Sequence, residues 1–141
     1  MSMRLFLVAG LVLGFAIEAR AADYASAVSA YRRGHGLDAV KLDSKLNELA
    51  LQQAKAMAKS GTVSHNAAGF FAIRVAPLKR RLAAENIGAG FLKFEEMLKQ
   101  WQESRGHREN LLMKGARRLG VAYVDNPGSP YRKFWAMVIT D

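Results

Sequence analysis

Two of the three histidines of this chain stand in short polar stretches, and a third polar stretch supplies a carboxylate. His65 lies in "SHN", Glu85 in "AENI" and His107 in "GHR". If the three stretches converge, two imidazoles and one carboxylate share a site. That set suits a divalent cation such as zinc, acid–base chemistry in which the carboxylate raises the pKa of an imidazole, or a static hydrogen-bond network. Their spacing does not choose among the three, and each residue taken alone is more typical of a structural group.

Ser104 is a fourth candidate, because it precedes His107 by three residues and its hydroxyl could approach the ring as a nucleophile approaches its base. The alternative, which we favour, is that Ser104 caps the end of a helix. Gly106 is expected to stop that helix and to let the chain turn sharply before His107.

Two asparagines accompany these stretches. Asn86 and Asn110 each precede an apolar residue. We expect their amides to tie loops to backbone groups, which is a structural role.

The helices that must position these residues follow from apolar spacing. Apolar residues recur at three- and four-residue steps from Leu42 to Ala58 and predict a helix with one apolar face. Asp43 or Ser44 can cap its start, and Gly61 can end it. The remaining segments are predicted as a helix over 23–33, a loop over 62–69, a short helix over 70–82 interrupted at Pro77, and a helix over 91–104.

The end of the chain has a different period. Residues 118–125 and 133–140 alternate apolar and small or polar side chains around the turn "NPGSP". This pattern predicts a β-hairpin, which must pack on other elements to be stable. Helices followed by a small antiparallel sheet indicate an α+β layered domain.

The first 21 residues are typical of a secretory signal peptide. A basic start, an apolar run over 5–17 and the small-x-small sequence Ala19-Arg20-Ala21 follow one another. The apolar run is shorter than the roughly 20 residues of a spanning helix, although an uncleaved anchor is the rival interpretation. We therefore predict a signal peptide over 1–21, one domain over 22–141, and a secreted or periplasmic location.

The charge and the absence of cysteine limit the partners. The formal net charge is +9, which favours anionic surfaces such as membrane lipid or acidic polysaccharide; solubility alone is the other explanation. Export makes nucleic acid the least favoured partner, and we expect a monomer. With no cysteine, any metal site must use His, Asp or Glu.

The order of the motifs resembles the CAP superfamily, which comprises cysteine-rich secretory proteins, antigen 5 and pathogenesis-related 1 proteins, and whose domain is also called the SCP domain. The matching stretches cover nearly all of residues 22–141, and "WQESRGHREN" marks the short bacterial branch. They are 31–65, "AAENIGAG" (83–90), "WQESRGHRENLL" (101–112), "RLGVAYV" (118–124) and "KFWAMVIT" (133–140).

This resemblance implies an α-β-α sandwich with a central cleft lined by two histidines and two acids. His65 and His107 match the histidines, and Glu85 matches the first acid. The second acid is expected three residues after the tryptophan, where this chain has Ser104 beside Glu103. A shift of one residue on a helix turns a side chain by about 100°. The acid set is therefore incomplete or displaced, and the short loop between His65 and Glu85 implies a shallow cleft.

The family includes binders of sterols, fatty acids and other lipids, members that bind zinc through the two histidines, and members proposed as proteases. The resemblance thus implies a domain that binds a small apolar or lipid-like ligand, with zinc as a candidate cofactor at His65 and His107. The alternative is a metal-assisted hydrolase that uses His65, His107 and Glu85.

Overall fold

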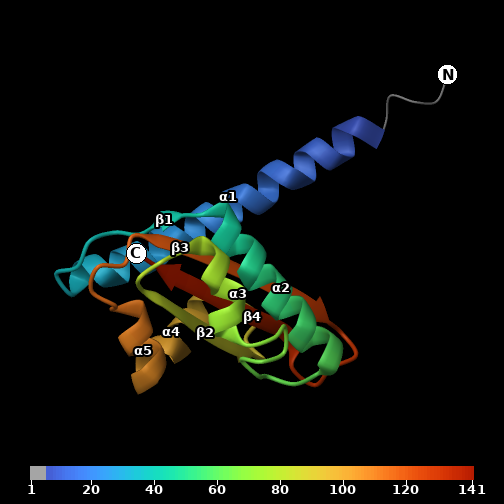
Figure 1. The fold of residues 1–141 in the computed structure, drawn as a ribbon. Helices are drawn as coiled ribbons and strands as arrows, with labels where there is room; N and C mark the ends of the chain where they lie inside the picture. The colour runs from blue at the N-terminus through green and yellow to red at the C-terminus, as the bar shows by residue number, and fades with distance from the viewer. Residues whose placement is uncertain (1–5) are drawn as a thin grey trace.

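A four-stranded sheet forms the centre of the fold. The computed structural model describes residues 6–141, with side chains from Arg20 onward. The strands are β1 (Lys41–Leu42), β2 (Ala83–Ala89), β3 (Arg118–Asn126) and β4 (Arg132–Thr140), in the order β1-β3-β4-β2 (Figure 1). β1 runs parallel to β3, and the other neighbours are antiparallel. The predicted hairpin is confirmed as β3 and β4, whereas β1 and β2 were not predicted.

Helices cover both faces of this sheet. α2 (Ser44–Ser60) packs on one face, and the short α3 (Phe71–Val75) and the 3-10 helix η1 (Ala76–Leu78) lie on the same side. α1 (Phe6–Gly34), α4 (Phe94–Glu103) and α5 (Arg105–Leu111) contribute to the core on the other face. The three layers confirm the predicted α+β class and the α-β-α sandwich.

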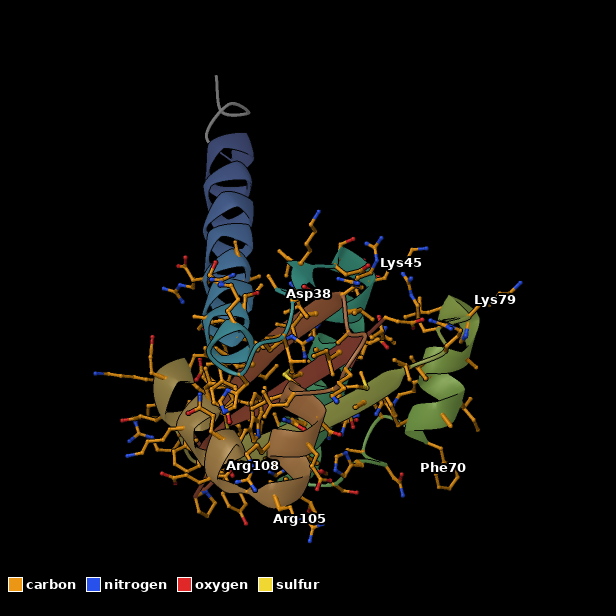
Figure 2. All side chains as sticks on the ribbon, turned by 90° about the vertical axis from the view of Figure 1, so that its left-hand side faces the viewer. Asp38, Lys45, Phe70, Lys79, Arg105 and Arg108 are labelled. Atoms are coloured by element: carbon orange, nitrogen blue, oxygen red, sulfur yellow. The ribbon has the colours of Figure 1, made fainter. Side chains whose placement is uncertain are left out.

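The break between α4 and α5 differs from the prediction. Ser104, not Gly106, interrupts the helix: its backbone is extended, with φ −92° and ψ 123°. The carbonyl of Ser104 accepts the amide of Arg108 at 2.8 Å and so starts α5. Gly106 lies within α5 at a φ that is not positive. Arg105 and Arg108 project from this short helix into solvent (Figure 2).

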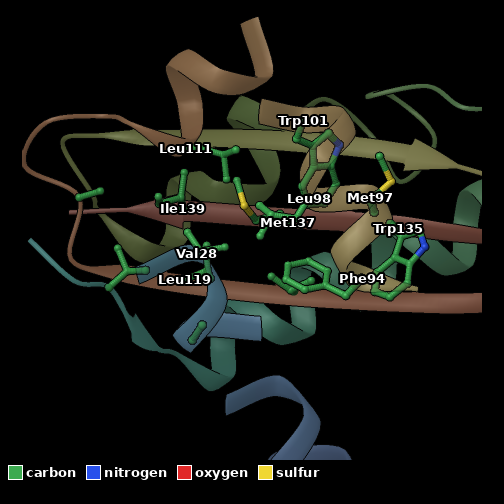
Figure 3. Close-up of a cluster of buried hydrophobic side chains, with 14 residues drawn as sticks. Val28, Phe94, Met97, Leu98, Trp101, Leu111, Leu119, Trp135, Met137 and Ile139 are labelled. Carbon is green, nitrogen blue, oxygen red and sulfur yellow. The ribbon is translucent and has the colours of Figure 1, made fainter. Parts of the chain in front are cut away.

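Side chains along β4 alternate between the two faces of the sheet, so this strand contributes residues to the hydrophobic core on each face. Trp135, Met137 and Ile139 face α1, α4 and α5, where they meet Phe94 and Trp101 (Figure 3). The intervening residues of β4 face α2; they are Phe134, Ala136 and Val138. β4 is one of the two inner strands of the sheet, and both of its faces are buried.

α2 lies directly on β3 at Gly120. A Cβ atom at position 120 would lie 2.1 Å from the carbonyl carbon of Leu46 and 2.2 Å from the amide nitrogen of Asn47. The side-chain oxygen of Asn47 accepts the amide of Val121 at 2.8 Å. The helix and the strand are therefore in backbone contact, and only glycine leaves room for it.

Arg32 of α1 is fully buried, and no carboxylate of the described residues pairs with it. Its guanidinium donates to the carbonyls of Asp38 (2.8 Å), Leu111 (2.9 Å), Met113 (3.0 Å) and, more weakly, Ala116 (3.4 Å). Burial lowers the pKa of Arg32 from its ordinary value. These bonds connect α1 to the end of α5, where unpaired helix carbonyls favour a cation.

The helix predicted over 23–33 is the last part of the longer α1. The predicted signal peptide overlaps α1 from Phe6, and its first five residues lie outside the described residues. Arg20 donates to the hydroxyl of Tyr123 at 2.9 Å, and Ala21 is buried. Within the described residues, no helix has the length and apolar character needed to cross a bilayer. Cleavage after residue 21 stays a prediction.

Candidate functional site

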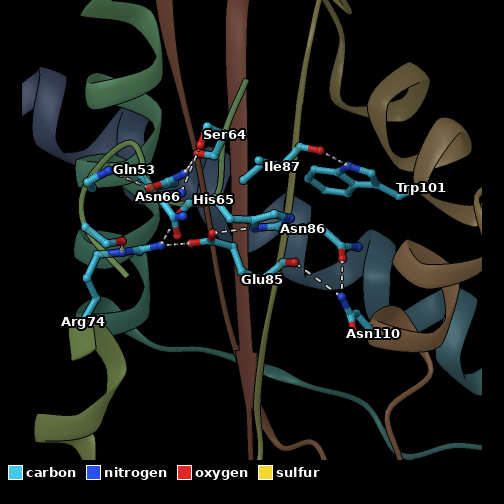
Figure 4. Close-up of polar contacts among 12 residues, drawn as sticks. Gln53, Ser64, His65, Asn66, Arg74, Glu85, Asn86, Ile87, Trp101 and Asn110 are labelled. Atoms are coloured by element: carbon cyan, nitrogen blue, oxygen red, sulfur yellow. Dashed lines mark hydrogen bonds and ion pairs between the residues drawn. The ribbon is translucent and has the colours of Figure 1, made fainter. Parts of the chain in front are cut away.

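The site lies at the outer edge of the sheet, along β2. This strand pairs with β4 on one side only. Successive side chains of a strand point to opposite faces, so Glu85 lies on the face of α2 and Asn86 on the face of α5. Residues from both helical layers therefore meet at one strand (Figure 4).

Glu85 is the most enclosed charged group of the site. Its side chain is 1% exposed, and each oxygen has a partner. Oε1 lies 2.9 Å from Nδ1 of His65, and Oε2 accepts from the guanidinium of Arg74 at 2.7 Å. Charge-assisted bonds of this length are strong, so the carboxylate holds both partners in place.

His65 lies in the loop between α2 and α3. Gln53, buried on α2, donates to the carbonyl of Ser64 at 2.6 Å and accepts the amide of Ala68 at 3.2 Å. Arg74 donates to the carbonyl of His65 at 3.2 Å. The loop is thus fixed at both sides of the imidazole. The ring is 52% exposed, and its Nε2 has no hydrogen-bond partner among the described residues.

His107 lies in α5, with its ring centroid 6.5 Å from that of Trp101. Asn86 donates to its backbone carbonyl at 3.0 Å. Its Nδ1 is buried without a hydrogen-bond partner in the part of the chain that the structure describes. The pKa of His107 lies below its ordinary value because burial disfavours the imidazolium and because the charge of His65 repels it. His107 therefore favours the neutral form.

The two asparagines have the predicted structural role. Asn110 donates to the carbonyl of Glu85 at 3.3 Å and to the side-chain oxygen of Asn86 at 2.9 Å. Trp101 donates its indole N–H to the carbonyl of Ile87 at 3.1 Å. α4 and α5 thereby satisfy two carbonyls at the outer edge of β2, those of Glu85 and Ile87.

The other two candidates lie apart from this network. Glu103 is exposed on α4, and its nearest ion partner is Lys99 at 4.0 Å. Ser104 stands at the junction of α4 and α5, as a cap would, but its hydroxyl makes no capping bond. Neither residue has a hydrogen bond or ion pair to His65, Glu85 or His107 within residues 20–141.

Sequence reasoning missed Arg74 and Gln53. Arg74 falls within the short helix predicted over 70–82, and its side chain is only 7% exposed. A single arginine among the apolar residues of α3 was the available signal. Gln53 falls within the apolar stripe of α2, between Ala50 and Met57, and a buried glutamine requires partners.

The chemistry of the site is restricted by which of its side-chain nitrogens and oxygens are still unpaired. Nε2 of His65 has no partner among the described residues, and neither do the buried Nδ1 of His107 and Nη1 of Arg74, whereas both oxygens of Glu85 are occupied. In the same part of the chain, no three His, Asp or Glu side chains form a group that could hold a metal ion. His65 and His107 are the side chains here that could contribute to a cation whose other ligands came from water or from a bound molecule, with Glu85 orienting His65 from behind.

The fold and the site define the class of the protein, because the chain matches the model of the cysteine-rich secretory protein family, CAP, over residues 25–139. The chain belongs to this family. It is similar to the uncharacterized protein YkwD of Bacillus subtilis, with 28% identity over 102 residues that cover 70% of this chain and 40% of YkwD.

Two solved structures show the same fold. An extracellular protein of Bacillus anthracis that contains an SCP domain is 26% identical, with a TM-score of 0.73 over 87% of this chain and 40% of that one. An outer surface protein of Borrelia burgdorferi is 17% identical, with a TM-score of 0.73 over 84% of this chain and 88% of that one. The chain thus spans about 40% of the length of the two Bacillus proteins.

Proposed function

We propose that this CAP domain works outside the cytoplasm as a binding domain for a small molecule that has a polar end and an apolar, lipid-like remainder. The polar end would bind at His65 and His107. The signal-peptide pattern of residues 1–21 supports export, as does the similarity to an extracellular protein of Bacillus anthracis. The central cleft that the family resemblance implies is the expected place for the apolar remainder.

The occupancy of Glu85 is the observation that carries this proposal. A general base needs a lone pair that faces water or substrate. Both oxygens of Glu85 are bound within the protein, and the side chain is 1% exposed. The carboxylate is therefore suited to orienting His65, whose free nitrogen points away from it. This arrangement favours binding over hydrolysis.

Exposed apolar side chains beside the loop support a ligand with an apolar part. Val63 and Phe70 flank His65 in sequence and are 38% and 64% exposed. Apolar groups next to polar contacts are typical of small-molecule sites.

A divalent cation such as zinc is the second candidate. Its support is the bond from His65 to Glu85, since metal-binding histidines usually donate their other ring nitrogen to a carboxylate or carbonyl. His65 and His107 would hold the cation, which when bound would act as a Lewis acid toward a ligand oxygen. A hydrolase of this type stays the alternative function.

The test is binding of a fluorescent long-chain fatty acid, and separately of Zn²⁺ by calorimetry, to the wild type and to His65→Ala and His107→Ala. His35→Ala is the matched control, because His35 is exposed and its ring has a hydrogen bond only to the carbonyl of Tyr31 among the described residues. We expect both site variants to lose fatty-acid binding at least tenfold and the control to retain it. Equal fatty-acid binding by all four proteins would refute the proposed site. Zinc binding lost in both site variants would support the second candidate.

A further inference from the structure

The segment from Phe70 to Arg81, which contains α3 and η1, has an apolar outer side that nothing in the described structure covers. Phe70 is 64% exposed and Ile73 is 70% exposed. Phe70 is the N-cap residue of α3 and Ile73 lies in its first turn, with the amide of Ile73 donating to the carbonyl of Phe70 at 3.0 Å. The two exposed side chains therefore lie at the same end of the helix, and we call this pair the apolar projection. They are the two most exposed large apolar residues among those described.

The inner side of the same segment is firmly attached. Phe71 and Leu78 pack against the core under α2, and Arg74 is held by Glu85 and by the carbonyl of Gly69 at 2.9 Å. The outward position of Phe70 and Ile73 is therefore imposed by the contacts of their neighbours on the inner side. Two large apolar groups held in water in this way are typical of an interaction surface.

Basic residues follow the apolar projection directly. Lys79, Arg80 and Arg81 end the segment, and no acidic residue occurs between Glu48 and Glu85. Arg80 lies 3.9 Å from Asp43, and Arg81 lies 3.3 Å from Asp141 although its side chain is 88% exposed. Lys79 has no ion pair among the described residues. Lys79 adopts a left-handed backbone, with φ 51°, where the chain turns out of η1. Figure 2 shows Phe70 and Lys79 projecting from the same side of the molecule.

We propose that this segment docks the protein on an anionic phospholipid bilayer, with Phe70 and Ile73 entering the interface and Lys79 and Arg81 contacting the headgroups. Apolar residues beside a basic cluster are the two attractions that peripheral membrane binding combines. A second copy of the chain is a poorer occupant, because self-association through this surface would bring like charges together. The proposal does not require a ligand at His65 and His107, although Phe70 also lies beside that site.

The test is sedimentation with vesicles made of equal parts phosphatidylglycerol and phosphatidylcholine, compared with vesicles of phosphatidylcholine alone. We expect binding to the anionic vesicles only. Phe70→Ser with Ile73→Ser should weaken the partition coefficient roughly tenfold or more. Leu92→Ser, at a residue 51% exposed elsewhere on the surface, should leave it unchanged.

The contribution of the basic residues to vesicle binding is tested with a separate pair of variants. Lys79→Gln with Arg81→Gln should weaken binding by roughly fivefold for each charge removed. Lys99→Gln with Arg105→Gln removes the same net charge from exposed positions on α4 and α5, and should weaken it less. An equal loss in the two pairs would show attraction by net charge alone and would overturn the proposal. The proposal would also be overturned if the wild type did not bind anionic vesicles. It would be overturned as well if the Phe70/Ile73 and Leu92 variants lost binding equally.

Discussion

Gly120→Ala tests the backbone contact that joins α2 to the sheet. The added Cβ would lie 2.1 Å from the carbonyl carbon of Leu46, about 1.3 Å short of the 3.4 Å at which ordinary contact begins. The atoms it meets are backbone atoms of Leu46 and Asn47, so no change of rotamer can relieve the overlap. α2 must move away from β3 or β3 must bend.

The expected loss of stability follows from what that movement breaks. Overpacking of a close contact costs roughly 1–3 kcal/mol. Separation of Asn47 from the amide of Val121, now 2.8 Å apart, leaves a buried donor unpaired at a cost of roughly 1–3 kcal/mol. Together these terms predict a loss of roughly 2–6 kcal/mol. For a chain of this size, that corresponds to a melting temperature lower by roughly 8–25 °C.

Urea unfolding and thermal melting of purified protein measure this loss against two controls. Gly106→Ala adds a Cβ with nothing within 4 Å inside α5, and should be neutral or stabilise by about 0.5–1 kcal/mol. Gly88→Ala places its Cβ against the flexible end of Met97, and should cost less than Gly120→Ala. A Gly120→Ala protein that unfolds within about 0.5 kcal/mol of the wild type would refute the contact.

Four further results are expected. Asn110→Ala should lose roughly 1–3 kcal/mol in urea unfolding, because the carbonyl of Glu85 and the side-chain oxygen of Asn86 lose a donor; an unchanged midpoint would contradict this. Arg32→Met leaves up to four carbonyls unpaired and should destabilise by more than Asn110→Ala; thermal melting checks it, and an equal or smaller shift would argue against the role of Arg32. The pKa of His107 is lowered in the folded state, so the unfolded chain binds the proton more readily. Stability should therefore fall as pH drops below the ordinary value of about 6.5 and level off below the folded pKa. His107→Gln should reduce that fall, as measured by urea midpoints at about pH 7.5 and 5. If the midpoint changed equally in the wild type and the variant, His107 would not be the source of the pH dependence. Finally, exported protein should begin at Ala22 or within a residue or two, whereas a membrane-bound form with intact Met1 by N-terminal sequencing would refute cleavage.

The helices and strands that could be predicted are those determined by the pattern of residues within their own segment of the sequence. The predicted stripe of α2 and its predicted ends are confirmed: Asp43 accepts from the amides of Lys45 and Leu46, and Gly61 is left-handed with φ 69°. The β3–β4 hairpin followed from alternation around a turn. β2 was missed because "AAENIGA" holds small residues and buried polar groups rather than alternating β-branched ones, and it becomes a strand by pairing with β4, which lies far later along the chain.

The site could be predicted only in part for the same reason. Twenty residues separate His65 from Glu85, and nothing in that spacing brings them together; the family resemblance supplied the pairing. The partners that fix the pair, Arg74 and Gln53, act through tertiary contacts. In the sequence alone they are one basic and one polar side chain among apolar ones.

The cover that α4 and α5 place over β2 has a consequence for how the protein avoids self-assembly. An edge strand with free carbonyls and amides is a template for a strand from another molecule. Asn110 and Trp101 block that template at Glu85 and Ile87. The asparagine and tryptophan of "WQESRGHREN" therefore act as gatekeepers against strand addition as well as supports of the site. Variants that remove them to probe binding should be checked for aggregation before any loss of function is assigned to the ligand.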